Sequence, residues 1–488
     1  MNIRSTCKML GGLLLFLGVM LLTPIPFALF HRDGDWDSFV LSSALALAAG
    51  GFLFLFFRRE EEISYREGFG IVTFGWIAFA LFGALPFVFS GAIPNMIDAF
   101  FESMPGFTTT GASVVTDFDG LSESIFFWRA MTHWLGGMGI IVLSIAILPF
   151  LGVGGMQLFE AEVPGPTADR LSPRIQTTAK LLWGVYFLLT FAETILLMTG
   201  GMDFHDAVCH AFATMATGGF STRSASVGAY DSHYINGVIT FFMVMAGANF
   251  SLHYMALRGR FRSYFRSQEF LFYGGVLLVA FVAMAFLNRR IYPDAGTNAS
   301  HAAFQVTSIM TTTGFATADF ERWPVLGQYI LITLMFLGGC AGSTGGGMKN
   351  VRVLLLVKHA YVQLFRLNHP RGVRILKLDG KAVPDAVMQS ILGFFALYIG
   401  IFVVSSLLMA ALGLDLITAG ASVVACLSNI GPGLGEVGPT DHYAHVPAAG
   451  KLLLTLCMLL GRLELFTVLV LLFPSFWKKW EGGRQRQA

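Results

Sequence analysis

The chain has 488 residues, 55% of them hydrophobic and only 13% charged, and its mean hydropathy is +0.66. This much apolar surface cannot be buried in one water-soluble core, so the composition excludes a soluble globular protein and predicts an integral membrane protein. The formal net charge of +2 gives no indication of a nucleic-acid partner.

The N-terminus begins with a short basic segment, containing Arg4 and Lys8, before an apolar stretch that extends to about Phe30. This stretch is longer than the apolar part of a signal peptide and has no evident small-residue cleavage site, so we expect a retained span. Together with the next apolar run it predicts a two-helix leader at 1–60. The charged turn RREEEISYREG at 58–68 separates this leader from the rest of the chain.

About ten apolar runs are long enough to cross a bilayer as helices of roughly 20 residues each. Helices are required because the bilayer offers no water to the backbone, and the short alternating segments of an outer-membrane barrel are not seen. The runs lie near 9–30, 37–57, 69–91, 124–150, 180–200, 234–257, 269–288, 325–360 with an interruption, 388–412 and 450–473.

Lysine and arginine are concentrated in segments that lie on one side of the membrane if the spans alternate. Most of the 32 occur at the N-terminus and at 58–66, 170–180, 258–266, 349–381 and 478–486. By the positive-inside tendency this side is cytoplasmic, so both termini are expected inside the cell. Arg289 and Arg290, in an outer loop, are local exceptions.

One short pattern occurs four times: an alanine is followed twelve positions later by a glycine in a loop rich in small and polar residues. The four copies are Asp98-Ala99 to Gly111, Asp206-Ala207 to Gly219, His301-Ala302 to Gly314 and Thr418-Ala419 to Gly431. A fourfold repeat of glycine loops in an apolar chain predicts four pore loops around one axis, all on the outer half of the membrane.

The repeat divides the chain into a leader and four units of helix, re-entrant segment and helix. Each re-entrant segment has room for a short helix that begins at its polar residue, Asp98, Asp206, His301 or Thr418, and ends toward mid-membrane. The predicted units are the leader at 1–60 and the pore repeats at 61–165, 166–266, 267–381 and 382–488. We therefore expect an all-α polytopic membrane protein with four pseudo-symmetric repeats around one ion pore.

The glycine loops supply the chemistry that an ion filter needs. Backbone carbonyls can replace the water around an alkali ion, and glycine allows backbone angles that turn consecutive carbonyls toward one axis. The alternative for any single loop is a tight turn between helices, but four loops in one register favour the filter. The predicted filter residues are Thr109, Thr110, Gly111, Thr217, Gly218, Gly219, Thr312, Thr313, Gly314, Asn429, Ile430 and Gly431.

Residues 338–347, GGCAGSTGGG, contain six glycines in ten and interrupt the span that follows the third loop. Glycine costs roughly 1 kcal/mol per helical position relative to alanine, so we expect this span to break inside the membrane. Unwound backbone at that depth is tolerated around a water-filled cavity, which makes the segment a candidate gate. Close helix packing through small residues is the alternative. The predicted gate glycines are Gly338, Gly339, Gly342, Gly345, Gly346 and Gly347.

Charged residues near this segment are further gate candidates. Arg462 lies within the apolar run 450–473, where a charge costs at least about 2.5 kcal/mol and tends to mark an ion path. Snorkelling or an ion pair with Glu464 is the alternative, although residues two apart on a helix do not face each other. Lys349 and Arg352 follow the glycine-rich segment and fit either a gate or a cytoplasmic anchor.

Several sequence segments carry a resemblance to a known family. FFESMPGFTTTGAS, FWRAMTHWLGGMGIIVL, TMATGGFST, GANFSLHY, GGCAGSTGGGMKNVR and GRLELFTVLVLL resemble the Trk/Ktr/HKT superfamily of potassium transporters, and in particular its bacterial Trk-type membrane subunit. The likeness covers nearly the whole chain. It implies a K⁺-selective pathway in the bacterial inner membrane, subunits that pair into homodimers, an intramembrane gate at 338–347, and an arginine below the filter at Arg462. Gly111 stands where sodium-conducting plant members can have serine, which favours K⁺.

The resemblance also implies a cytosolic regulatory partner of the TrkA type that binds ATP, ADP or NAD. No nucleotide site is evident in this chain, since the segment from Gly342 departs from a phosphate-binding loop by a methionine before its lysine. The basic segments 349–381 and 478–486 are candidate docking surfaces for the partner or contacts for anionic lipid. We expect K⁺ at the filter, and neither a bound cofactor nor a metal site elsewhere.

Other functional classes fit less well. His205 and His210, with Asp203 and Asp206, could suggest a metallohydrolase, but their spacing does not place both histidines on one helical face, so we expect no enzyme. A symporter that couples K⁺ to protons or sodium remains open, with Asp98, Glu102 or His301 as titratable candidates. A non-transporting scaffold is the remote alternative. Glu102, nine residues before its glycine, is expected to lie behind the filter as a structural carboxylate.

Overall fold

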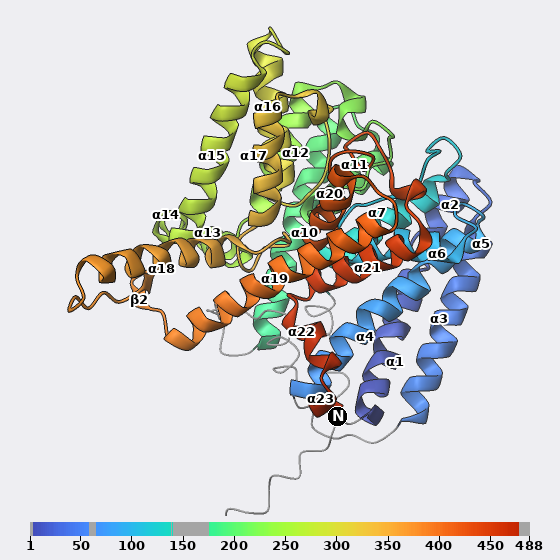
Figure 1. Ribbon diagram of the computed structural model, residues 1–488. Helices are drawn as coiled ribbons and strands as arrows, with labels where there is room; N and C mark the ends of the chain where they lie inside the picture. Colours follow the sequence, from blue (N-terminus) through green and yellow to red (C-terminus); the bar gives the residue numbers. More distant parts are fainter. Residues whose placement is uncertain (1–2, 58–64, 138, 140–174, 478–488) are drawn as a thin grey trace, which may run out of the picture.

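The computed structural model describes residues 3–57, 65–137, 139 and 175–477. In this part of the chain the fold is almost entirely helical, and the two short strands β1 (Lys377–Leu378) and β2 (Lys381–Ala382) form one antiparallel hairpin. The predicted all-α class is confirmed (Figure 1).

The leader consists of α1 (Ile3–Met20), α2 (Ile25–His31) and α3 (Trp36–Phe56). Helices α1 and α3 pack closely, and the Ser43 hydroxyl donates to the Gly18 carbonyl at 2.6 Å. The leader lies against α4 (Tyr65–Gly83), at one side of the molecule in Figure 1.

Four units follow, each with a long helix, a short helix, a glycine loop and a second membrane helix. The first contains α4, α5 (Leu85–Phe89), α6 (Met96–Phe107) and α7 (Glu123–Gly137), and the second contains α10 (Ile175–Thr199), α11 (Phe204–Met215), η1 (Ser226–Tyr230), α12 (His233–Ala246), α13 (Phe250–Leu257) and α14 (Arg262–Arg266). The third contains α15 (Gln268–Asn288), α16 (Ala295–Met310), η2 (Phe320–Arg322), α17 (Val325–Leu337), α18 (Asn350–Asn368) and the hairpin. The fourth contains α19 (Asp385–Ala411), α20 (Leu416–Leu427), η3 (Tyr443–His445), α21 (Ala448–Arg462), α22 (Phe466–Leu469), η4 (Val470–Leu472) and α23 (Pro474–Trp477).

Six helical stretches of the described chain are long and apolar enough to cross a membrane. Two of the predicted spans are not single helices. The run at 234–257 bends by 102° between α12 and α13, and the run at 450–473 bends by 112° after α21. The bends have local causes, since Asn249 caps a new helix by accepting from the Ser251 N–H and Glu464 and Leu465 adopt positive φ. The run at 124–150 extends beyond the described residues.

The four short helices α6, α11, α16 and α20 begin earlier than predicted. Their caps are Asn95, Asp203, Asp294 and Asp415, each of which accepts a hydrogen bond from a backbone N–H in the first turn. Asp98, Asp206, His301 and Thr418 therefore lie inside their helices and do not begin them. The cap lies three residues before the predicted start in α6, α11 and α20 and seven residues before it in α16, because several short polar residues near a helix start can serve as its cap.

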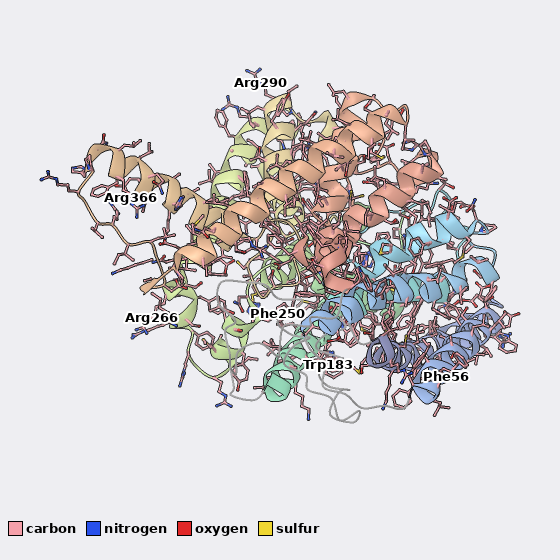
Figure 2. The ribbon with its side chains drawn as sticks, turned by 60° about the horizontal axis from the view of Figure 1, so that its bottom comes forward. Phe56, Trp183, Phe250, Arg266, Arg290 and Arg366 are labelled. Atoms are coloured by element: carbon pink, nitrogen blue, oxygen red, sulfur yellow. The ribbon has the colours of Figure 1, made fainter. Side chains whose placement is uncertain are left out.

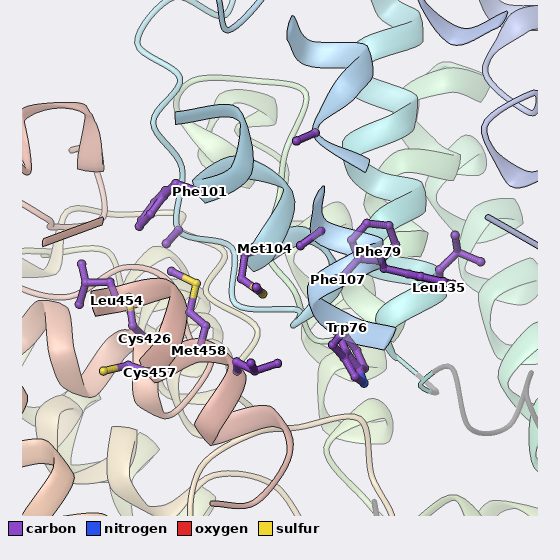
Figure 3. Packing of buried hydrophobic residues seen from close by; sticks show 14 of the residues in the cluster. Trp76, Phe79, Phe101, Met104, Phe107, Leu135, Cys426, Leu454, Cys457 and Met458 are labelled. Carbon is purple, nitrogen blue, oxygen red and sulfur yellow. The ribbon is translucent and has the colours of Figure 1, made fainter. Parts of the chain in front are cut away.

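The largest apolar core surrounds the first short helix, α6. Figure 3 shows Phe101, Met104 and Phe107 of α6 between Trp76 and Phe79 of α4 and side chains of α20 and α21. The first and fourth units thus meet although they are far apart in sequence. An ion pair at the N-terminal end of α6 adds to this contact, with Lys451 Nζ 2.6 Å from Asp98 Oδ1.

Basic side chains mark both ends of the long helix α15. Arg266 precedes it and Arg290 follows it, and Figure 2 shows the two at opposite edges of the molecule. Arg366, near the end of the projecting helix α18, lies toward the Arg266 side. The α18 end and the α14–α15 turn are joined through the hairpin, where Asp379 accepts from the Gln268 N–H at 2.8 Å.

Candidate ion pathway at the meeting of four loops

The four predicted loops adopt the same unusual backbone conformation. Two residues before its glycine, each loop has a residue with positive φ, namely Thr109 (53°), Thr217 (54°), Thr312 (62°) and Asn429 (57°). The glycines Gly111, Gly219, Gly314 and Gly431 also have positive φ, between 77° and 97°. Since positive φ is uncommon outside glycine, its recurrence at one register in four places shows that the repeat in sequence is a repeat in structure.

The four glycines form a closed ring of close contacts. A methyl group on any of them would meet a carbonyl oxygen of the next loop at a distance shorter than real side chains tolerate. The distances are 2.1 Å from Gly111 to Gly218, 2.1 Å from Gly219 to Thr313, 1.9 Å from Gly314 to Ile430 and 2.5 Å from Gly431 to Thr110. The last contact returns from the fourth loop to the first. The structure therefore brings all four predicted loops together around one axis, and only glycine fits at these positions.

The remaining predicted filter residues are buried beside the four glycines. Thr110, Thr217, Thr312, Thr313, Asn429 and Ile430 are fully buried, and Thr109 is nearly so. Hydroxyl contacts link Thr110 to Thr108 and Thr313 to Thr311, each at 2.8 Å. The Asn429 amide donates to the Thr110 hydroxyl at 2.9 Å, which joins the fourth loop to the first.

A cavity of about 160 Å³ lies on one side of the ring, and all four glycines contribute to its wall. Its wall also includes Arg129, Arg223 and Asp441. Glu321 accepts from the Gly435 N–H at 2.6 Å, and burial, followed by the carboxylates of Asp319 and Asp441, raises the pKa of Glu321. The cavity gives access to the ring from the side on which the loops return to the next helix.

The glycine-rich segment 338–347 lies against the opposite side of the ring. The chain leaves α17 at Leu337 and resumes helix only at Asn350. The Gly346 N–H donates to the Thr312 hydroxyl at 2.6 Å, and the Gly347 N–H donates to the Ser428 carbonyl at 2.9 Å. Thr344 donates to the Met215 carbonyl at 3.0 Å. The segment thus contacts the bases of the second, third and fourth loops.

Glycine is required within this segment for the same reason as in the ring. Gly338, Gly342 and Gly347 have positive φ, and a methyl group on Gly338 would lie 2.2 Å from the Gly346 carbonyl oxygen. The two arms of the segment therefore pack backbone to backbone. Asn350 closes the base, since its side-chain amide donates to the Gly338 carbonyl at 2.6 Å.

Arg462, at the end of α21, contacts this segment directly. Its guanidinium donates to the Thr344 carbonyl at 2.8 Å, to the Gly137 carbonyl at 2.9 Å and to the Gly136 carbonyl. Glu464 forms an ion pair with Arg352, so the alternative pairing of Arg462 with Glu464 is not the arrangement in the structure. Lys349 also faces the segment, and its ammonium donates to the Gly345 carbonyl.

Glu269, which the sequence analysis did not single out, also binds the segment. Its carboxylate Oε1 accepts from the Ala341 N–H at 2.6 Å and from the Val351 N–H at 3.1 Å. One oxygen therefore joins the middle of the segment to the first turn of α18. The signal in the sequence was an acidic residue at the start of an otherwise apolar run.

The histidines that suggested a metal site have separate partners. His205 pairs with Glu123 at 2.8 Å, whereas His210 contacts the Ser221 hydroxyl at 3.0 Å. Among the residues that the structure describes, no three histidine, cysteine, aspartate or glutamate side chains are arranged to hold a metal ion.

Comparisons with known proteins agree with this geometry. Residues 37–479 match the family model TrkH, described as a cation transport protein. The chain is 46% identical to the Trk system potassium uptake protein TrkH of Salmonella typhimurium over 98% of its length and all of that protein, and 45% identical to the Escherichia coli protein of the same name with the same coverage.

A solved structure gives the same result. The structure superposes on the crystal structure of the potassium transporter TrkH from Vibrio parahaemolyticus with a TM-score of 0.89 and 40% identity, covering 98% of this chain and all of the other. These relatives are transport proteins, and the resemblance inferred from the sequence motifs is confirmed. The chain belongs to the TrkH family of cation transport proteins.

Proposed function

We propose that this chain mediates potassium uptake across the bacterial inner membrane through a single pore bounded by the four glycine loops. The observation that carries the proposal is the closed ring of contacts from Gly111 through Gly219 and Gly314 to Gly431 and back. The names of the relatives, which specify potassium uptake, supply the ion.

In this proposal the ring selects the ion with backbone oxygens. The carbonyls of the loops take the place of the water that K⁺ loses, and no fixed anion is required. The four short helices end four residues before their glycines, so their partly negative C-terminal ends point toward the pathway and favour a cation. The filter residues are the twelve predicted from sequence, from Thr109 to Gly431.

The segment 338–347 acts as the gate. It occupies the side of the ring opposite the cavity, where it is held by Arg462, Lys349 and Glu269. Ions that leave the ring on this side must displace it. A cytosolic partner of the TrkA type, carrying the nucleotide, would control this displacement, and α18, which follows the segment directly, is the natural lever. We further propose a homodimer with both termini in the cytoplasm.

Coupling of K⁺ to protons or sodium is less well supported. The titratable candidates have protein partners, since Asp98 pairs with Lys451, Glu102 accepts from Arg129 Nε at 2.9 Å, and His301 contacts the Thr317 hydroxyl at 3.0 Å. None of these three belongs to the wall of the cavity above the ring. A pore that needs only the K⁺ gradient is therefore preferred.

Flux measurements test the proposal. The purified chain is placed in liposomes and rubidium uptake is followed with and without a proton or sodium gradient. We expect uptake driven by the rubidium gradient alone. A requirement for the second gradient would establish a symporter, and no uptake in any condition would contradict transport through this chain.

The variant Gly111→Ser tests the filter. The serine side chain would enter the space occupied by the Gly218 carbonyl, so we expect a reduced preference for rubidium over sodium. Unchanged preference would contradict a role for this loop in the pathway.

A further inference from the structure

Each short helix carries a buried polar residue nine positions before its filter glycine. These are Glu102, His210, Gln305 and Ser422, and all four side chains are fully buried. None of the four lines the cavity beside the ring. A buried polar group is costly unless it is hydrogen-bonded, so the partners of these four side chains indicate what each one does.

Glu102 binds the segment that leaves the first loop. Its carboxylate accepts from the Val114 N–H at 2.8 Å and from the Ser113 hydroxyl at 3.0 and 3.1 Å. Ser113 and Val114 follow Gly111 directly, after one alanine. The carboxylate therefore fixes the position of the chain just beyond the filter.

His210 makes the equivalent contact in the second repeat. Its Nδ1 lies 2.8 Å from the Asp206 carbonyl, which can only accept, so Nδ1 carries the proton of the neutral ring. Nε2 is then the acceptor for the Ser221 hydroxyl at 3.0 Å. Ser221 is two residues after Gly219, as Ser113 is two residues after Gly111.

Gln305 does the same in the third repeat with different chemistry. Its side-chain amide donates to the Ala318 carbonyl at 2.9 Å, four residues after Gly314. Three repeats thus use three residue types, a carboxylate, an imidazole and an amide, for one contact between the short helix and the chain that leaves the filter.

Ser422 is the exception. Its hydroxyl donates to the Ala419 carbonyl of its own helix at 3.2 Å. The serine side chain is too short to reach the residues that follow Gly431. In this repeat Tyr443 takes over, since its hydroxyl donates to the Gly431 carbonyl at 2.6 Å. The fourth repeat therefore offers an internal control, because the register position is the same but the contact is absent.

Arg129 joins the contacts of the first two repeats. Its guanidinium pairs with Glu102 at 2.8 Å and donates to the Ser113 hydroxyl at 3.1 Å and to the Ser221 carbonyl at 3.3 Å. It also stacks over the Phe220 ring at 4.2 Å. Arg129 therefore connects the chain that follows the first loop, at Ser113, with the chain that follows the second loop, at Ser221.

We propose that Glu102, His210 and Gln305 are positioning residues for ion selectivity. Each one holds the residues that follow its loop glycine, and so keeps that loop at a fixed distance from the pore axis. This inference rests on the proposed function of the loops as a filter. In the account of selectivity based on cavity size, a carbonyl ring favours K⁺ over Na⁺ while it resists collapse around the smaller ion. Hydrogen bonds from behind supply that resistance without placing any side chain in the path.

The test measures the ratio of rubidium to sodium permeability, because a merely structural defect lowers the amount of active protein but leaves this ratio unchanged. The variants are His210→Leu and Gln305→Leu, which remove the bond at nearly constant volume. We expect each to lower the ratio roughly fivefold, the effect of losing one hydrogen bond of about 1 kcal/mol. Ser422→Ala, the matched control, should leave the ratio at the wild-type value.

A conservative variant separates hydrogen bonding from packing. His210→Gln installs the residue that the third repeat uses at the same register, so it should restore most of the ratio lost in His210→Leu. Size-exclusion chromatography in detergent identifies variants that fail to fold. Glu102→Gln tests the first repeat in the same way, since it keeps an acceptor oxygen but loses the charge that pairs with Arg129.

Two outcomes would overturn the inference. One is an unchanged ratio in both leucine variants while Gly111→Ser alters it, which would leave the filter in place but remove the role of the supporting residues. The other is a His210→Gln variant as unselective as His210→Leu. If Gly111→Ser also has no effect, the failure lies in the proposed filter itself.

Discussion

Alanine in place of each of the four loop glycines tests the ring most directly, because the structure predicts a graded effect, largest at Gly314 and smallest at Gly431. The added methyl group would lie 1.9 Å from a carbonyl oxygen at Gly314, 2.1 Å at Gly111 and Gly219, and 2.5 Å at Gly431. Ordinary contact begins near 3.4 Å. The neighbouring loop must therefore retreat by the difference, about 1.5 Å at Gly314 but only about 0.9 Å at Gly431.

Backbone strain adds to this clash. All four glycines have positive φ, where a side chain costs roughly 1–2 kcal/mol. If the loop relieves this strain by leaving its conducting conformation, the conducting population falls about fivefold to thirtyfold. We expect every variant to lose at least this much rubidium flux or selectivity, with Gly314→Ala affected most and Gly431→Ala least.

The assay is rubidium uptake into liposomes with increasing sodium as competitor. Gly91→Ala is the matched control, since Gly91 has the same φ as Gly111, 77°, but no atom lies within 4 Å of the added methyl group. It should behave as the wild type in uptake. Wild-type selectivity in Gly314→Ala, or a Gly431→Ala variant more impaired than Gly314→Ala, would refute the ring geometry.

Three further predictions concern the gate and the contact between the first and fourth units. Deletion of the glycines at 345–347 should raise basal rubidium flux severalfold, because the segment beneath the ring becomes too short to cover it; equal or lower flux in correctly folded protein would argue against a gate. Glu269→Ala should also raise flux, since the segment and the first turn of α18 lose their shared acceptor, whereas Glu269→Gln, which keeps an acceptor oxygen, should stay close to the wild type in the same assay. Lys451→Met should lower the melting temperature in detergent by a few degrees, about 1–2 kcal/mol for a partly buried ion pair with Asp98, and a melting temperature equal to that of the wild type would show that the pair adds nothing.

The common register of the four loops could be predicted from sequence because the repeat is local. Each glycine lies twelve positions after its alanine. The residues between them form the end of a short helix and then a turn with the same backbone conformation in all four repeats. Glycine at the end of that turn has a direct physical reason, the positive φ and the nearby carbonyl. Polar residues in the helix carry less information, so the caps at Asp203 and Asp415 were assigned three residues too late.

The features that sequence did not reveal depend on distant contacts. The bend after α12 follows a cap by Asn249 within an otherwise apolar run, and average hydropathy does not register such a bend. Glu269 binds Ala341 and Val351, more than 70 residues away along the chain. Sequence periodicity cannot identify the partner of a buried carboxylate across that separation.

The breaks in the second helices indicate what movement of the proposed gate segment 338–347 would require. Helix α12 ends at Ala246, whose carbonyl accepts from the Thr344 hydroxyl at 3.2 Å, and the next carbonyl, that of Gly247, accepts from the Cys340 N–H at 2.8 Å. Arg462 likewise holds the carbonyls at the end of α7. Free helix-end carbonyls need a donor, so the segment can leave only if water takes its place. In the proposed function, opening of the gate and hydration of the pathway beneath the ring would therefore occur together, since water would replace the donors that the segment supplies to these carbonyls.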